Sequence, residues 1–188
     1  GQLPIIWNKA KNFNVYDIKG NKFIDFTSTI FVANIGHSNS TFKRKLVNSI
    51  NNNLISTYAY PNKLREVYLS KLIKFCGKGF EKAYLLSSGS EALEACIKII
   101  RLFALKNKKG LGIISVSGNW HGRTTGSQLL SDNSEQSNWI KFKNKEIYHL
   151  RFPYPWTLKK YNKTSLEILD EDLRSLSKKI NISKKISG

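Results

Sequence analysis

A turn of small polar residues, Ser87-Ser88-Gly89-Ser90, precedes the most apolar helical stretch of the sequence and is the first candidate for a binding site. The first turn of a helix exposes unpaired N–H groups and the positive end of the helix dipole. Gly89 lets a bound group approach the backbone, and the hydroxyls of Ser88 and Ser90 add donors. The turn therefore suits a phosphate group. The alternative is an ordinary serine cap in which Glu91 completes the first helical turn.

A second candidate is the loop Gly118-Asn119-Trp120-His121-Gly122-Arg123-Thr124, which follows a predicted strand ending at Val116. Ligands of open α/β sheets bind at the carboxyl ends of the strands. Trp120 can stack on a planar ring there while His121 supplies a hydrogen bond. The alternative is a packed aromatic side chain in a loop with a histidine at the surface.

The two motifs lie in a segment that alternates between predicted strands and helices. Residues 82–86 form a short apolar strand before the serine turn. Residues 91–105 form a helix whose polar residues share one narrow stripe, so we expect it to be packed on most sides. Strands over residues 111–116 and 146–150 and a helix over residues 165–180 follow. This order predicts an α/β fold with a parallel sheet and covering helices.

The pattern upstream of these motifs predicts a hairpin and two helices. Residues 13–17 and 22–26 alternate around Lys19-Gly20-Asn21, which is typical of a β-hairpin. Helical spacing predicts one helix capped at Asn39-Ser40 and a second that begins after Pro61-Asn62 and stops at Gly77. The first helix is expected to be amphipathic, because apolar residues recur in it at helical spacing, namely Phe42, Leu46, Val47, Ile50 and Leu54. In the second helix the residues expected to face inward are Leu64, Tyr68, Leu72 and Phe75.

Together, the two motifs resemble a known family. Residues 87–101 resemble the phosphate-binding segment of class III aminotransferases, which depend on pyridoxal 5′-phosphate (PLP) and include the ornithine, 4-aminobutyrate and glutamate-semialdehyde enzymes. Residues 120–124 lie at about the distance of the family's aromatic-His-Gly element. Further segments that resemble the family are Val15-Tyr16-Asp17, Gly20, Ile24-Asp25-Phe26, Asn34-Ile35-Gly36-His37 and Pro153-Tyr154-Pro155.

The resemblance runs from about residue 13 to residue 156 and implies a partial PLP-transferase fold of type I. Residues 1–60 would form the N-terminal segment, with the hairpin, a helix and a region near the substrate mouth and dimer contact. Residues 61–188 would form the first, incomplete part of the PLP-binding large domain with its mostly parallel sheet.

By position, the resemblance implies that Ser88, Gly89 and Ser90 hold the PLP phosphate through backbone N–H groups and hydroxyls. Trp120 would stack on the pyridine ring, where the family usually has Phe or Tyr. His121 would lie against the cofactor ring system. These five residues are the predicted cofactor-binding set.

The stretch from Ser28 to Phe31 would help to line the substrate mouth, close to a dimer partner. The alternative interpretation of these residues is a buried strand end. Ser28 and Phe31 are the predicted substrate-binding residues.

The resemblance implies transfer of an amino group between an amino donor and a keto acid or aldehyde in the full-length protein. The family's Schiff-base lysine and the aspartate at the pyridine nitrogen come later than the matched region, so we assign no catalytic residue and expect the chain alone to be inactive. Asp170-Glu171-Asp172 is better explained as a helix cap than as the acidic motif. The alternatives are a mutase or decarboxylase of the same fold, or a basic binding module without catalytic activity.

The formal net charge of +18 raises the question of a nucleic-acid or membrane partner. We expect neither, because 25 of the 31 basic residues are lysines spread along the whole chain, and a more acidic remainder of the protein would balance them. Cys76 and Cys96 are too few for a disulfide framework or a zinc site. The expected partners are small-molecule substrates and a second subunit in a homodimer. With no transmembrane run or signal-peptide pattern, we expect a cytoplasmic protein.

Overall fold

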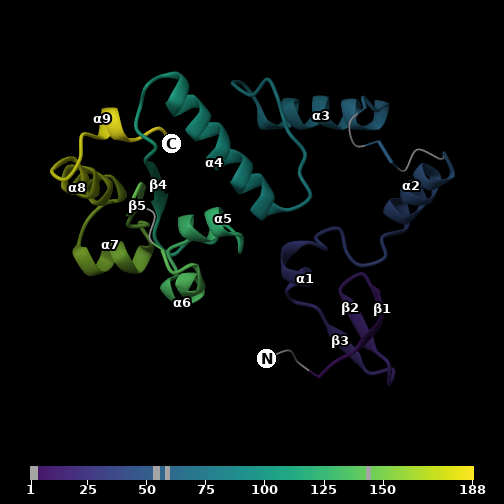
Figure 1. The fold of residues 1–188 in the computed structure, drawn as a ribbon. Helices are drawn as coiled ribbons and strands as arrows, with labels where there is room; N and C mark the ends of the chain where they lie inside the picture. The colour runs from purple at the N-terminus through teal and green to yellow at the C-terminus, as the bar shows by residue number, and fades with distance from the viewer. Residues whose placement is uncertain (1–3, 53–55, 58–59, 143–144) are drawn as a thin grey trace. The chain divides into compact units, whose positions relative to one another are not determined.

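The computed structural model describes residues 4–52, 56–57, 60–142 and 145–188. It divides the chain into two compact units, one up to Lys82 and one from Ala83 to Gly188 (Figure 1). Each unit is described by itself. The boundary expected after residue 60 concerns the domains of the complete enzyme and stays a prediction.

The first unit begins with an antiparallel sheet of three strands, β1 (Trp7–Lys11), β2 (Asn14–Asp17) and β3 (Lys22–Ile24), in the order β1-β2-β3. The predicted hairpin is therefore confirmed, and β1 is an additional strand that the alternation did not predict. Val15 on the central strand is 1% exposed and anchors this small sheet. The turn after β2 is closed by Asp17, whose carboxylate accepts the backbone N–H groups of Lys19 and Asn21 at 2.9 and 2.8 Å.

Three helical elements follow in the first unit, namely α1 (Ser28–Phe31), α2 (Ser40–Asn51) and α3 (Lys63–Cys76). Asn39 caps α2 and Asn62 caps α3, because each side-chain oxygen accepts N–H groups of the first helical turn. Gly77, at a φ of +86°, ends α3. Both predicted helices are confirmed, although Leu54 of the first lies outside the described residues.

The predicted inward face of α3 is wrong for most of its length. Leu64, Tyr68 and Phe75 are all more than half exposed, and Leu72 alone of the four is half-buried. The helical periodicity was real, but no described part of the first unit covers that stripe. Periodicity indicates which face of a helix is apolar and does not supply the element that buries it.

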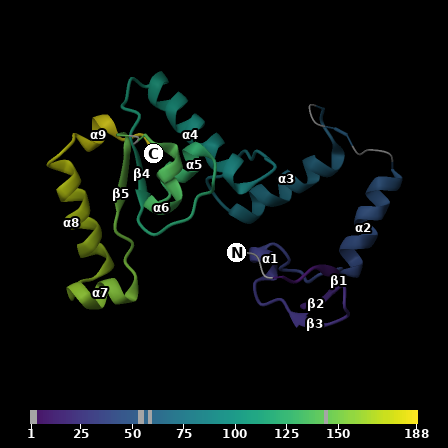
Figure 2. The same cartoon turned by 60° about the horizontal axis from the view of Figure 1, so that its bottom comes forward.

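The second unit is built on a pair of parallel strands, β4 (Ile113–Val116) and β5 (Ile147–Leu150), with Ile113 opposite Ile147. In both views the helix α4 (Gly89–Lys106) lies on one side of the strand pair and α8 (Ser165–Ser177) on the other (Figures 1 and 2). The remaining elements are α5 (Thr125–Leu130), α6 (Ser134–Ser137), a 3-10 turn (Asn138–Ile140), α7 (Pro155–Tyr161) and α9 (Ile182–Lys185). The core is formed by Ile97, Ile113 and Leu130, against which Leu93, Ile100 and Ile147 pack.

The α/β class and the parallel sheet are confirmed, with two local corrections. Residues 82–86 are not a strand, because no described segment pairs with their backbone. The helix α4 is not packed on most sides, since Ile99, Leu102 and Phe103 are at least half exposed. The last residues of the chain, and not residues 82–86, run beside β4, where the N–H of Ile114 donates to the carbonyl of Gly188 at 2.8 Å.

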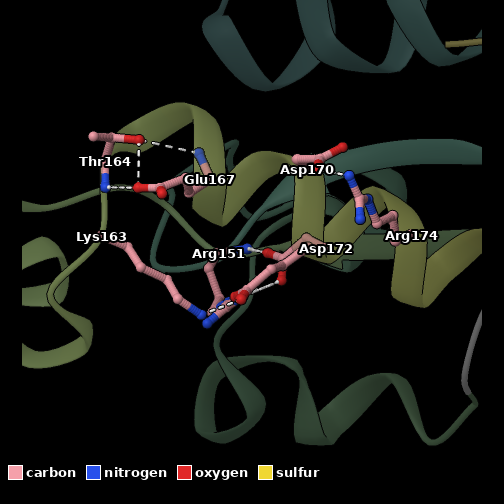
Figure 3. Close-up of polar contacts among 8 residues, drawn as sticks. Arg151, Lys163, Thr164, Glu167, Asp170, Asp172 and Arg174 are labelled. Carbon is pink, nitrogen blue, oxygen red and sulfur yellow. Dashed lines mark hydrogen bonds and ion pairs between the residues drawn. The ribbon is translucent and has the colours of Figure 1, made fainter.

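The acidic run at residues 170–172 was predicted to cap a helix, and that prediction is wrong. The cap of α8 is Thr164, whose hydroxyl accepts the N–H of Glu167 while the Glu167 carboxylate accepts the N–H of Thr164 (Figure 3). The acidic run lies within the helix, where Asp172 binds the backbone N–H and the Nε of Arg151 at 2.7 and 2.8 Å. These carboxylates fasten α8 to the end of β5.

No helix in the described ranges is both long and apolar enough to cross a membrane.

Candidate cofactor site

The N-terminus of α4 carries the predicted phosphate turn. The Ser88 hydroxyl accepts the N–H of Glu91 at 3.2 Å, and the Glu91 carboxylate accepts the N–H of Ser88 at 3.1 Å. The alternative of a serine cap is thus observed. It leaves the N–H groups of Gly89 and Ser90 without an acceptor in the described residues. A methyl group placed on Gly89 would meet no atom within 4 Å, so the space beside its Cα is open.

The second motif touches the first at Ser90. The N–H of Arg123 donates to the Ser90 hydroxyl at 3.3 Å. Gly122, at a φ of +134°, lies so close to Ser90 that a Cβ on it would collide with the serine side chain. The structure therefore brings the serine turn and the tryptophan loop, 33 residues apart in the sequence, into direct contact.

Glu94, one turn further along α4, fixes the other end of the same loop. Its carboxylate accepts the N–H groups of Gly126 and Ser127 at 2.8 and 3.0 Å, and also the hydroxyl of Thr124. Burial alone would raise the pKa of this carboxyl, but the hydrogen bonds from Thr124, Ser127 and Gly126 hold the pKa below its ordinary value. The sequence pattern had placed Glu94 on the polar stripe of the helix without a partner.

Trp120 stands at the surface of this loop with 58% of its side chain exposed. The guanidinium of Arg123 lies 5.2 Å from the centre of its ring, within the range of a cation–π contact. A flat and accessible indole is what a stacking platform requires. The alternative of a packed aromatic side chain does not hold for the described residues.

His121 is half-buried, so the alternative of a surface histidine does not hold either. Its backbone N–H donates to the hydroxyl of Ser131 at 2.8 Å, and its Nε2 lies 3.3 Å from the hydroxyl of Ser115. Burial, assisted by the neighbouring His149, lowers the pKa of His121 below its ordinary value. The lowered pKa favours the neutral form of the ring.

An open cavity of about 500 Å³ lies between α4 and β4 and adjoins the tryptophan loop. Its lining combines apolar side chains of α4 with Ser115, Asn119, His121 and Tyr154. The Oδ1 of Asn119 is buried and accepts no hydrogen bond in the described residues. A donor group of a ligand would satisfy it.

Ser28 and Phe31, the predicted substrate-binding residues, belong to the first unit. They are the ends of α1, whose four residues all have φ between +48° and +68°. Non-glycine residues rarely adopt this left-handed conformation, and it is costly for a β-branched residue such as Ile30. The turn is held by the Asp25 carboxylate, which accepts the N–H groups of Thr27 and Thr29.

The alternative interpretation of α1 as a buried strand end is wrong. Phe31 is 86% exposed, and the backbone is a left-handed turn rather than extended. Ser28 lines a pocket of about 270 Å³ together with Asp25 and His37. Strained and exposed turns of this kind recur at functional sites, and the part played by Ser28 and Phe31 stays a prediction.

Comparison with known proteins decides the family. The family model described as aminotransferase class-III matches residues 1–188, the whole of the chain. The chain belongs to the class III aminotransferases. Among curated proteins it is 30% identical to the ornithine aminotransferase of Saccharomyces cerevisiae over 140 residues, and 35% identical to the acetylornithine aminotransferase of Methanocaldococcus jannaschii over 130 residues.

These matches cover 72% and 66% of the chain but only 32% and 31% of the two relatives, so the chain spans about a third of their length. Solved structures agree on the fold. An (S)-enantioselective omega-transaminase from Thermomicrobium roseum superposes with a TM-score of 0.85 at 17% identity, over 98% of this chain and 42% of that one. A PLP-bound amine transaminase from an uncultivated Pseudomonas species gives 0.83 at 16% identity, over 99% and 44%.

The family, the partial α/β fold and PLP as the family's cofactor, all predicted from the sequence, are confirmed. The residues present also suit such a group, since unpaired N–H donors at a helix N-terminus, an exposed indole and an unsatisfied amide oxygen occur in one unit. Three residues that organise the site were not predicted. They are Glu94, Ser115 and Ser131, and of these only Ser115 could have been indicated by its polarity, because it lies within an otherwise apolar strand.

Proposed function

We propose that the complete protein transfers an amino group between an amino donor and a keto acid or aldehyde, using PLP. The observation that carries the proposal is the contact of Ser90 with Gly122 and Arg123. It joins the N–H groups of Gly89 and Ser90, which have no acceptor among the described residues, to a loop that presents an exposed indole. One small region of the second unit therefore offers both recognition elements that PLP needs, a phosphate site and a ring platform.

The roles follow from the groups that remain available. The N–H groups of Gly89 and Ser90, with the hydroxyl of Ser88, would bind the phosphate. Trp120 would cover one face of the pyridine ring, and the half-buried His121 would support that loop from below. PLP, when bound, supplies the electron sink of the reaction. The described residues contribute binding and orientation.

We assign no catalytic residue within residues 1–188. In the proposal, the Schiff-base lysine and the acid at the pyridine nitrogen belong to the part of the complete protein that the relatives have in addition. The chain by itself is then expected to hold PLP weakly and not to transaminate. Ser28 and Phe31 are proposed to line the substrate mouth in the homodimer.

The amino donor is proposed to carry an amino group remote from its α-carbon, because the curated relatives are named for ornithine and acetylornithine. The test is to incubate the complete protein with PLP, 2-oxoglutarate and each of ornithine, N-acetylornithine and 4-aminobutyrate, and to measure glutamate. Glutamate that appears only with a donor supports the proposal. Rearranged or decarboxylated donor without consumption of 2-oxoglutarate would favour a mutase or a decarboxylase instead.

A variant pair tests the site itself. Trp120→Ala should weaken PLP binding about tenfold, because stacking of a planar ring on an aromatic side chain contributes about 0.5–1.5 kcal/mol beyond the area it buries. Trp139→Ala removes a tryptophan that lies outside the tryptophan loop and donates to Gln128, and it serves as the control. Equal loss of PLP affinity in both variants would contradict the assignment of Trp120.

A further inference from the structure

Ser115, the third residue of β4, lies beneath the tryptophan loop and is only 6% exposed. Its hydroxyl has three neighbours at hydrogen-bond distance. They are the carbonyl of Leu130 at 2.8 Å, the Nδ2 of Asn119 at 2.7 Å and the Nε2 of His121 at 3.3 Å. No other described hydroxyl of the site has as many partners.

The direction of each bond follows from the chemistry of the groups. A carbonyl only accepts, so the single hydroxyl proton of Ser115 goes to Leu130. The amide nitrogen of Asn119 only donates and takes one of the two lone pairs of the hydroxyl. The second lone pair is left for His121, whose Nε2 must therefore carry a proton. The ring is thus held as the Nε2–H tautomer, with a bare Nδ1.

The two residues bound to Ser115 are the immediate neighbours of Trp120 in the sequence. Asn119 precedes Trp120 and His121 follows it, so one buried hydroxyl fastens the loop on both sides of the indole. The backbone N–H of His121 is held in addition by Ser131, itself 8% exposed. Trp120 alone among these residues is exposed, with a relative exposure of 58%.

We propose that Ser115 is a positioning residue for Trp120, acting through Asn119 and the Nε2–H tautomer of His121. The inference rests on the proposed function, because it assigns Ser115 the task of presenting the indole to the cofactor ring. When a freely rotating aromatic side chain binds a ligand, its loss of conformational entropy offsets part of the stacking energy. Ser115 removes that cost before the ligand arrives.

The binding test uses the full chain of the complete protein and pyridoxine 5′-phosphate, which has the ring and phosphate of PLP but no aldehyde. Binding is measured by the quenching of tryptophan fluorescence. The Trp120→Phe variant shows how much of that quenching comes from Trp120. Ser115→Ala should weaken binding about fivefold to tenfold, since a buried hydroxyl with three partners is lost. Ser115→Thr keeps the hydroxyl, its methyl group can enter the adjoining cavity, and binding should stay within about twofold.

The matched control is Ser187→Ala. Ser187 is half-buried and its hydroxyl donates to the carbonyl of Gly110, before β4 begins, so its loss should leave the affinity unchanged. Affinity that is equal in wild type and Ser115→Ala, with normal quenching of Trp120, would overturn the inference but not the proposed function. Absence of any binding in the wild type would overturn the proposed function, and the inference with it.

A second measurement is independent of the ligand. Nitrogen-15 NMR of the imidazole should show protonated Nε2 and bare Nδ1 for His121 in the wild type and in Ser115→Thr. In Ser115→Ala the two neutral tautomers should mix. A wild-type His121 protonated at Nδ1 would contradict the network, because Ser115 has no second proton to donate.

Discussion

Gly122 is the residue at which the tryptophan loop approaches the serine turn, and no larger residue fits at this position. A Cβ there would collide with the hydroxyls of both Ser90 and Ser127, and the φ of +134° is itself unfavourable for other residues. Gly122→Ala should therefore destabilise the second unit by about 1–3 kcal/mol through overpacking, measured by urea unfolding of the complete protein. Gly89→Ala is the control, because open space surrounds Gly89 and stability should not fall. Equal destabilisation in both variants would contradict the tight contact.

Asp25 makes the first unit sensitive to acid. Hydrogen bonds, chiefly from His37 and then from Thr27, lower the pKa of the Asp25 carboxyl from 3.8 to about 2. Since this pKa is depressed by folding, the stabilisation is complete above pH 4 and is lost as the pH falls towards 2. The protection of the Thr29 N–H from hydrogen exchange, taken relative to the intrinsic exchange rate at the same pH, should fall over that window because this N–H donates to Asp25. Asp25→Asn keeps an acceptor oxygen but removes the titrating group, so the protection should no longer depend on pH in this range, and an unchanged pH profile in this variant would contradict the assignment.

At the scale of elements, Arg151 links the end of β5 to α8. It donates through its backbone N–H and its Nε to Asp172, and its guanidinium also pairs with Glu171 at 3.2 Å (Figure 3). Arg151→Lys keeps the charge but loses the fork of donors. It should lower the free energy of unfolding by roughly 1–2 kcal/mol, measured by urea unfolding.

The control for Arg151 is on the same helix. Arg174 pairs with Asp170 one turn away at 2.7 Å, and both side chains are largely exposed (Figure 3). Exposed pairs of this spacing contribute about 0.3–0.5 kcal/mol, so Arg174→Lys should have little effect. A larger loss at Arg174 than at Arg151 would show that the Arg151 contacts do not hold α8.

The elements that could be predicted are those specified by neighbouring residues. Helices α2 and α3 were predicted because Asn39 and Asn62 cap them locally, and the hairpin because Gly20 marks its turn. The elements that were missed depend on distant partners or on strain. Residues 82–86 look like a strand but have no described neighbour, and the left-handed turn at Ser28–Phe31 consists of residue types that favour extended backbone.

The candidate site shows the same division. The serine turn and the tryptophan loop were each recognisable from local spacing, and their contact through Ser90 is what the structure adds. Ser115 and Glu94 could not be assigned from the sequence, because the partners of each lie on segments that only folding brings near. The acidic run was misassigned for the same reason, since Arg151 is about 20 residues away from it.

At the scale of the whole molecule, the feature that calls for an explanation is the exposed apolar surface of α4. On α4 the side chains of Ile99, Leu102, Phe103 and Leu105 are each at least half exposed. A contiguous face of this kind on a helix marks a contact that the described residues do not supply. We propose that this face is covered in the complete protein by a further part of the chain, because the present chain spans only about a third of the length of its relatives.

This proposal predicts that one substitution has different effects on the 188-residue chain and on the complete protein. In the 188-residue chain Leu102→Glu should change the free energy of unfolding by no more than about 0.5 kcal/mol, measured by urea unfolding, because it places a charge on exposed surface. In the complete protein the same substitution should destabilise by several kcal/mol, since it would bury an unpaired carboxylate. Lys98→Gln, on the polar stripe of the same helix, changes the net charge by the same single unit and should have little effect on either protein. If Leu102→Glu leaves the stability of the complete protein unchanged, the face of α4 is solvent-exposed there too, and neither a partner nor a further part of the chain packs on it.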